Sequence, residues 1–234
     1  MKQQLKELIK KQPVLVKMYR IFSSGSAFKP TITKSVKGTG NKLNFDNSAL
    51  FIQCSLTIVG NNNEITIEDT TWFNNVAFVI YGDNNKIIVS KGVRFEEGGS
   101  LWVEDHHCEI HLGEQGYYRN VSIAVTEPNS KVIVGKDCGF AYDVEIKTGD
   151  SHSIIDLATN KRINYAKNVT IADHVWVAPH VTILKGVNIA SNTVVATRSL
   201  VTKSFQQENV IIAGNPATIV KENIGWSKWR IYDK

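Results

Sequence analysis

The chain has 234 residues, of which 42% are hydrophobic and 21% are charged, and this composition excludes a disordered or collagen-like chain. The formal net charge of +5 indicates an anionic partner, but the basic residues form no dense cluster interleaved with aromatic side chains, which disfavours nucleic acid. The longest unbroken apolar run, residues 76–81, is far below the roughly 20 residues that a membrane-spanning helix needs, so no membrane span is expected.

Residues 1–36 are expected to form a helical cap. Apolar side chains lie among lysines between Gln3 and Phe22, and Pro13 interrupts them, which predicts one or two short helices. The first residues lack an apolar signal-peptide core and a cleavage site, so the protein is expected in the cytoplasm. The cysteines lie far apart, which disfavours a disulfide framework and fits a reducing compartment: Cys54, Cys108 and Cys138.

A long repeat follows the cap. Five similar segments, each with polar turn residues and a final apolar residue, end 22 or 23 residues apart, at Leu43, Ile65, Ile87, Ile110 and Val132. We interpret each repeat as one coil of a solenoid with an enlarged corner. The Asn and Gly residues at these corners tolerate a left-handed backbone, and they predict a stacked asparagine ladder.

Residues 147–168 carry no repeat. Shorter apolar steps precede this segment and resume after it, so it is expected to project from the solenoid as a loop. Loops on a rigid scaffold are where functional residues collect.

After the loop, apolar residues recur every sixth position, at Ile171, Val177, Ile183, Ile189, Val195 and Val201. A helix repeats at three and four and an isolated strand at two, so a period of six predicts short strands separated by regular bends. Three such strands complete a triangular coil of 18 residues with an Ile and Val core, which is a parallel β-helix. The solenoid is expected over residues 37–206, with residues 207–234 as a tail that closes it.

These hexads, followed by Ile211 to Ala217 and a Lys221-Glu222 tail, resemble the hexapeptide-repeat acyltransferases over about residues 43–222. The resemblance implies a left-handed parallel β-helix, a homotrimer, acetyl-CoA bound between neighbouring prisms and a histidine general base. The segments 148–156, 162–164 and 174–177 are similar to the branch that O-acetylates bacterial surface saccharides, among them capsular polysaccharides that contain sialic acid.

The resemblance implies two catalytic residues, His152 on the loop and Trp176 located 24 positions later. Near neutral pH an imidazole can take a proton from a sugar hydroxyl. Four acidic residues are candidates to orient His152, and the sequence does not choose among them: Asp143, Glu145, Asp150 and Asp156. Trp176 stands between two inward valines, so its indole is expected to point outward, where it can hold the acyl group or stabilise an oxyanion.

A second set of residues is expected to bind acetyl-CoA. Ala178, Ala196 and Gly214 are 18 residues apart, which predicts small side chains at one corner of successive coils, where a pantetheine arm can lie. Four basic residues are candidates for the CoA phosphates, of which the first and third are also 18 apart: Lys185, Arg198, Lys203 and Lys221.

Three alternatives remain open at this stage. Histidines at 106, 107, 111, 174 and 180 raise the possibility of zinc, but a spacing of six places His174 and His180 on different faces of a coil, so no metal is expected. The other two are an N-acetyltransferase acting on a nucleotide-linked amino sugar, and a non-catalytic β-helix that serves as a binding scaffold. The missing Gly-rich phosphate loop disfavours the former, and the projecting loop disfavours the latter.

Overall fold

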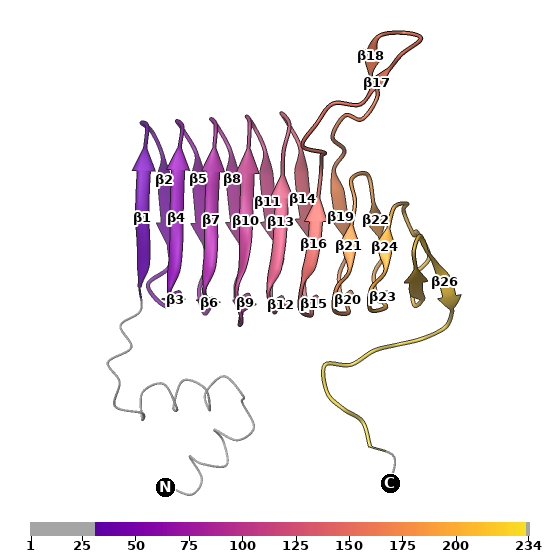
Figure 1. Cartoon of the computed structure of the whole chain (residues 1–234). Coiled ribbons are helices and arrows are strands. Elements are labelled where there is room, and N and C mark those ends of the chain that lie inside the picture. Colours follow the sequence, from indigo (N-terminus) through magenta and orange to yellow (C-terminus); the bar gives the residue numbers. More distant parts are fainter. Residues whose placement is uncertain (1–30, 233–234) are drawn as a thin grey trace, which may run out of the picture. The chain divides into compact units, whose positions relative to one another are not determined.

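The computed structural model describes residues 31–232, which form a left-handed parallel β-helix (Figure 1). In this view the chain rises along the front sheet, passes over the top to the rear sheet, and advances to the right with each coil, which defines the left hand. General crossover sterics favour the opposite hand. The left-handed fold predicted from the resemblance is therefore confirmed.

Three parallel sheets form the faces of the prism within residues 31–232. Sheet A has eight strands: β1 (Ile32–Lys37), β4 (Cys54–Val59), β7 (Val76–Tyr81), β10 (Gly99–Glu104), β13 (Val121–Val125), β16 (Val144–Lys147), β21 (Thr182–Ile183) and β24 (Leu200–Val201). Sheet B has seven strands: β2 (Lys42–Phe45), β5 (Glu64–Ile67), β8 (Lys86–Val89), β11 (Glu109–Leu112), β14 (Lys131–Val134), β19 (Val169–Ile171) and β22 (Asn188–Ile189).

Sheet C has nine strands, the last of which is antiparallel to its neighbour: β3 (Leu50–Ile52), β6 (Trp72–Asn74), β9 (Arg94–Phe95), β12 (Tyr117–Tyr118), β15 (Gly139–Phe140), β20 (Trp176–Val177), β23 (Val194–Val195), β25 (Ile211–Gly214) and β26 (Ala217–Lys221). The chain visits the sheets in the order A, B, C, so we name the three corners of the prism A/B, B/C and C/A. The remaining strands, β17 (Ile155–Asp156) and β18 (Lys161–Arg162), form a separate antiparallel hairpin.

The enlarged corner predicted for the long coils is wrong. Four residues, 38–41, join β1 to β2 at the A/B corner, and four residues, 184–187, join β21 to β22 at the same corner of a short coil. The additional residues instead lengthen the strands, because β4 has six residues and β5 has four where β21 and β22 have two each. Longer strands form more backbone hydrogen bonds with the strands of the coils on either side.

The core is a column of stacked apolar side chains, as the repeats predict. In the long coils sheet C contributes a row of aromatic rings, including Phe73, Phe95 and Tyr118, with successive centroids 5.7 and 4.8 Å apart. In the short coils the six-step residues are buried valines and isoleucines, such as Val177 and Ile183 at 0% exposure. Large rings fill the wide prism and branched aliphatic side chains fill the narrow one, as close packing requires.

The predicted asparagine ladder lies at the A/B corner. The Asn63 amide N–H donates to Asn41 Oδ1 (3.0 Å), the Asn85 amide N–H to Asn63 Oδ1 (2.9 Å), and the Cys108 amide N–H to Asn85 Oδ1 (2.8 Å). Asn63 and Asn85 are fully buried. Each side chain thus satisfies backbone groups at a bend where the sheet ladders are interrupted.

The two ends of the solenoid differ from the predicted boundaries. The strand β1 begins at Ile32, so the solenoid includes residues assigned to the cap, while the predicted helices lie outside the described residues. At the other end the hairpin of β25 and β26 completes sheet C, and residues 222–232 turn back from it. No helix within residues 31–232 has the length and apolar character of a membrane span.

Candidate active site

The predicted loop leaves the A/B corner between β16 and β19 and carries the β17–β18 hairpin, which projects beyond the solenoid (Figure 1). Asn164, 7% exposed, holds the root of this loop. Its Oδ1 accepts from the Ile154 amide N–H (2.7 Å), and its Nδ2 donates to Asp150 Oδ2 (2.7 Å) and to the His152 carbonyl (2.8 Å). The backbone around His152 is therefore fixed by a buried side chain.

Two further contacts tie the loop to the solenoid. The Arg162 guanidinium forms a forked pair with Glu127, in which Nη1 lies 3.0 Å from Oε2. Lys185 Nζ donates to Asp150 Oδ2 and to the Asn164 carbonyl (2.9 Å). Hydrogen bonds from Lys185 and Asn164 hold the pKa of Asp150 below its ordinary value of 3.8. Lys185, predicted to contact CoA phosphate, is thus engaged in holding the loop.

The imidazole of His152 is exposed and has no hydrogen bond or ion pair with any residue in the described part of the chain. The acidic candidates have other partners. Asp156 accepts from the Thr159 amide N–H (2.8 Å), Glu145 pairs with Lys147 (2.8 Å), and Asp143 pairs with His180 (3.4 Å). None of the four orients His152 within one chain.

Trp176 points outward from sheet C, as alternation predicts, and is 42% exposed. It pairs in register with Gly139 on the preceding coil and with Val194 on the following one. Ala178 and Ala196 follow at equivalent positions of the C/A corner, where their amide N–H groups donate to Val195 (2.9 Å) and Ile212 (2.8 Å).

The predicted place of Gly214 in this row is wrong by one residue. Val195 pairs with Ile212, so the residue equivalent to Ala196 is Ala213, because the last coil is one residue shorter than 18. Gly214 stands instead at the turn of the β25–β26 hairpin, with a φ of 110° that favours glycine. The row of small residues is preserved by Ala213.

The predicted phosphate-binding residues divide between two corners. Arg198 is exposed at the C/A corner and Lys221 is exposed at the end of β26. Lys203 stacks one coil after Lys185 at the A/B corner, with its Nζ 5.8 Å from the centroid of the Phe205 ring. Within one chain they do not form a single basic cluster.

His152 and Trp176 also lie on different sides of the prism. The loop projects from the A/B corner at the top of Figure 1, whereas β20 lies in sheet C at the bottom. One chain therefore does not bring the two predicted catalytic residues together.

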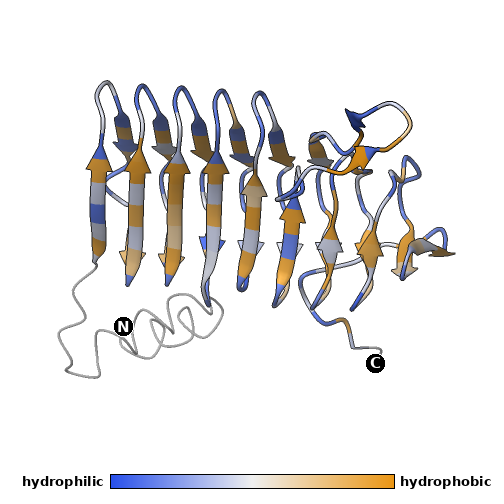
Figure 2. Ribbon diagram, turned by 45° about the horizontal axis from the view of Figure 1, so that its top comes forward, coloured by the Kyte–Doolittle hydropathy of each residue, from blue (hydrophilic) through white to orange (hydrophobic). Residues whose placement is uncertain are grey.

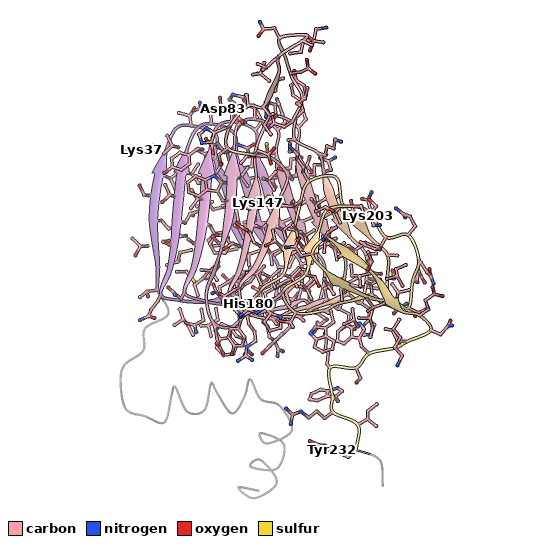
Figure 3. All side chains as sticks on the ribbon, turned by 45° about the vertical axis from the view of Figure 1, so that its right-hand side comes forward. Lys37, Asp83, Lys147, His180, Lys203 and Tyr232 are labelled. Atoms are coloured by element: carbon pink, nitrogen blue, oxygen red, sulfur yellow. The ribbon has the colours of Figure 1, made fainter. Side chains whose placement is uncertain are left out.

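The structure reveals a carboxylate and histidine ladder at the C/A corner that sequence reasoning missed. Asn120 Nδ2 donates to Asp143 Oδ1 (2.6 Å), and Asp143 Oδ2 lies 3.4 Å from His180 Nδ1. His180 is labelled at the lower edge of the solenoid in Figure 3. At the B/C corner Asp137 Oδ2 lies 2.7 Å from His174 Nδ1. In the strand register Glu145 pairs with Thr182 across the loop, an offset of 37 residues. The same offset separates Asp143 from His180 and Asp137 from His174, so an alignment of the coils across the loop would have found both Asp–His pairs.

The described residues show no group of three or more His, Cys, Asp or Glu side chains that could hold a metal ion.

The three cysteines are buried. Burial raises the pKa of Cys138 to about 12 and that of Cys108 to about 11. Such thiols stay protonated near neutral pH and are poor nucleophiles.

No protein-family model matches the chain. Residues of this chain are 42% identical over 88 positions to the polysialic acid O-acetyltransferase of Escherichia coli O1:K1 / APEC, and this match covers 38% of the chain but only 28% of that relative's length.

Two solved structures match over most of the chain. The polysialic acid O-acetyltransferase OatWY superposes with a TM-score of 0.78 at 32% identity, covering 87% of this chain and 94% of that one. The polySia-specific acetyltransferase NeuO superposes with a TM-score of 0.74 at 29% identity, covering 87% and 91%. With this coverage and identity, and with the coils and the projecting loop in place, the chain belongs to the left-handed β-helix, hexapeptide-repeat acyltransferases, in the branch that contains the polysialic acid O-acetyltransferases.

Proposed function

We propose that this protein is an O-acetyltransferase that moves acetyl from acetyl-CoA to a hydroxyl of a bacterial capsular polysaccharide, one that contains sialic acid. The observation that carries this proposal is the match to OatWY over 94% of that chain at 32% identity. The net charge of +5 is consistent with an acidic acceptor.

The active site is assembled between two copies of the chain, in a homotrimer. His152 and Trp176 lie on different sides of one prism, so a complete site needs the loop of one copy beside sheet C of the next. The projecting loop supports this arrangement, because its exposed side chains include Leu157 (96%) in the hairpin and, just after the hairpin, Ile163 (61%) and Tyr165 (59%). Figure 2 shows this apolar character as orange segments on the hairpin, and an exposed apolar patch of this kind marks an interaction site.

In the proposed mechanism His152 removes the proton of the acceptor hydroxyl as that oxygen attacks the thioester carbonyl carbon. The Trp176 indole N–H and a backbone N–H stabilise the resulting oxyanion, the carbon–sulfur bond then breaks, and the CoA sulfur leaves with the proton that His152 took. The transfer is direct. The raised pKa of the buried Cys108 and Cys138 supports this route over a cysteine acyl-enzyme.

The pantetheine arm of acetyl-CoA lies along the C/A corner, where Ala178 and Ala196 present only small side chains. Arg198 at the same corner and Lys221 on β26 meet the phosphates from this copy, and Lys203 meets them from the loop-bearing corner of the neighbour. Lys185 contributes through the loop that it anchors.

A thiol-release assay with acetyl-CoA and sialylated, other acidic and neutral glycans tests the proposal. We expect release with a sialylated glycan and a loss of about 10² to 10⁴ in rate for His152→Ala, with a large loss also for Trp176→Ala. His106→Ala is the matched control, because this histidine lies in the long coils at 52% side-chain exposure. Retained activity in His152→Ala contradicts the mechanism, acetylation of amino sugars alone indicates an N-acetyltransferase, and failure to bind acetyl-CoA indicates a scaffold.

Mixing the two inactive variants tests the shared site. If His152 and Trp176 come from different copies, refolding His152→Ala together with Trp176→Ala yields mixed trimers in which some sites carry both intact residues. We expect activity to return in the mixture and not in either variant alone. No recovery in mixtures that form trimers contradicts a site shared between copies.

A further inference from the structure

The segment after β26 turns back along the solenoid toward earlier coils (Figure 1). The Ile224 amide N–H donates to the Asn209 carbonyl (3.0 Å), and Lys228 Nζ donates to Asp137 and to the Gln115 carbonyl (3.2 Å). Asn209, Asp137 and Gln115 belong to different coils of the B/C corner. Residues 224–228, which we name the tail strap, therefore cross several coils.

The tail strap places Trp226 in a notch on sheet C. Gly139 stands in the outward row of this sheet between Tyr117 on the preceding coil and Trp176 on the following one. A glycine leaves this position without a side chain, and a Cβ built there would lie 3.7 Å from the Trp226 ring and meet nothing else within 4 Å. The Trp226 ring thus fills the space that the row leaves empty.

Trp226 is held there by His174 on its other side. The two rings stack with centroids 4.2 Å apart and planes 11° apart, and Trp226 Nε1 donates to the His174 carbonyl (2.8 Å). The His174 ring is fixed in turn, because its Nδ1 lies 2.7 Å from Asp137 Oδ2 and its Nε2 lies 3.3 Å from the Trp226 carbonyl. Asp137 also pairs with Lys228 of the tail strap. One carboxylate therefore contacts both the strap and the His174 ring on which Trp226 stacks.

The indole of Trp226 lies against the indole of Trp176, with centroids 6.1 Å apart and planes inclined by 39°. Trp176 is 42% exposed and has a glycine on the preceding coil, so without Trp226 one side of its indole would face the open notch. An indole with a free side can change rotamer. We propose that Trp226 is a positioning residue, a wedge that holds the Trp176 indole in its working orientation.

This proposal rests on the proposed function, since it gives Trp176 a role in transfer. Its energetic basis is that catalysis needs reacting groups within a fraction of an ångström, and a small misplacement can cost about 10²-fold in rate. In this proposal the strap acts through the Trp176 indole and supplies no reacting group of its own. Its effect is therefore expected in kcat, with the KM for acetyl-CoA changed less.

Two pairs of variants test the wedge. Trp226→Ala removes the ring, and Trp229→Ala is its matched control, because Trp229 lies three residues further on and is 69% exposed. Gly139→Leu keeps the strap but fills the notch, whereas Gly139→Ala adds only the Cβ that fits at 3.7 Å from Trp226. We expect kcat to fall about 10- to 100-fold for Trp226→Ala and Gly139→Leu, partial recovery with Trp226→Phe, and wild-type rates for both controls.

A spectroscopic measurement separates this proposal from the proposed function. Two indoles in close contact give a coupled signal in circular dichroism, which we expect in the wild type and in Trp229→Ala but not in Trp176→Ala or Trp226→Ala. Loss of the signal with an unchanged kcat in Trp226→Ala overturns the positioning role, and a wild type without the signal overturns the contact itself. Full activity in Trp176→Ala instead contradicts the proposed function, whatever the signal shows.

Discussion

The first coils and the last coils of this solenoid share one architecture but differ in what they present to solvent. Partners in adjacent long coils are 22 or 23 residues apart, as in Ile32 with Cys54 and Val76 with Gly99, whereas partners in the last coils, such as Thr182 and Leu200, are 18 apart. The long coils have six-residue strands in sheet A and an aromatic core. The short coils have two-residue strands and carry most of the candidate site residues.

This difference indicates that the two kinds of coil have different roles along the axis of the solenoid. Strands supply ladder hydrogen bonds and buried area, and the long coils have more of both. In the short coils most residues lie at corners, where side chains are free to meet a substrate. The projecting loop enters where the two kinds of coil meet, between β16 and β19. Changes in the long coils are therefore expected to affect stability, and changes in the short coils and loop to affect transfer.

The largest effect on stability is expected from the aromatic column. Phe73 is fully buried and stacks 5.3 Å from Phe51 and 5.7 Å from Phe95. Phe73→Ala should lower the free energy of unfolding by about 3–5 kcal/mol, because the neighbouring rings cannot close the cavity. Chemical denaturation measures this change, with Val59→Ala as the control, because Val59 lies on β4 of the long coils and is 40% exposed. A loss below about 1 kcal/mol contradicts a tightly packed long-coil core.

The next effect is expected from the asparagine ladder. Asn85 is fully buried; its Oδ1 accepts from the Cys108 amide N–H, and its Nδ2 donates to the Asp105 carbonyl (2.9 Å). Asn85→Ala leaves both backbone groups unpaired and should cost about 1–3 kcal/mol per group, measured by thermal or chemical unfolding. The exposed Asn44→Ala is the matched control. Equal stability of the two variants would mean that the ladder does not stabilise the corner.

Substitution of Lys185 is expected to have a smaller effect on stability but a clear effect on the flexibility of the projecting loop. Its ion pair with Asp150 is partly exposed, so Lys185→Met should change the free energy of unfolding by no more than about 1 kcal/mol. The loop should nevertheless loosen, which faster tryptic cleavage after Lys161 and Arg162 would report, together with a lower transfer rate. Lys203→Met, one coil later, is the control for the cleavage rate alone. Equal cleavage rates for the wild type and Lys185→Met contradict an anchoring role.

The smallest effect is a pH dependence of the tail strap. Partial burial acts to raise the pKa of Asp137, but hydrogen bonds from Lys228 and His174 outweigh it and hold that pKa below 3.8. A carboxyl whose folded pKa is lowered stabilises the folded contact above its unfolded pKa, and the contribution disappears as the pH falls through the folded value. Tryptophan emission should change as the pH falls below about 4. Asp137→Asn should abolish this dependence, and an unchanged acid transition in that variant contradicts it.

Much of the site followed from the sequence. The six-step pattern determined that Val175 and Val177 point inward and that Trp176 points outward, because side chains alternate along a strand. The 18-residue spacing of Ala178 and Ala196 placed them at one corner. The position predicted for Gly214 is wrong by one residue, because the last coil has 17 residues where the preceding coil has 18. The spacing of apolar residues does not reveal how many residues a turn contains.

Other features required the tertiary structure. The partners of Asp143, Asp150 and Asp156 depend on contacts that span up to 37 residues or close a turn of the loop. No local pattern encodes which of several carboxylates meets which partner. The separation of His152 from Trp176 depends on which corner the loop leaves. That position is set by the order of the three sheets.

By itself the sequence determined the solenoid, its two kinds of coil, the loop and the residues that line the prism, because these follow from periodic burial and local turn chemistry. Only the tertiary structure decided that the extra residues of the long coils lengthen strands, and that Trp226 returns to the notch at Gly139. Both depend on contacts between residues that are distant in the chain, such as the 52 positions that separate His174 from Trp226. Such contacts are selected by the shape and hydrogen-bonding capacity of the whole fold, which no short segment contains.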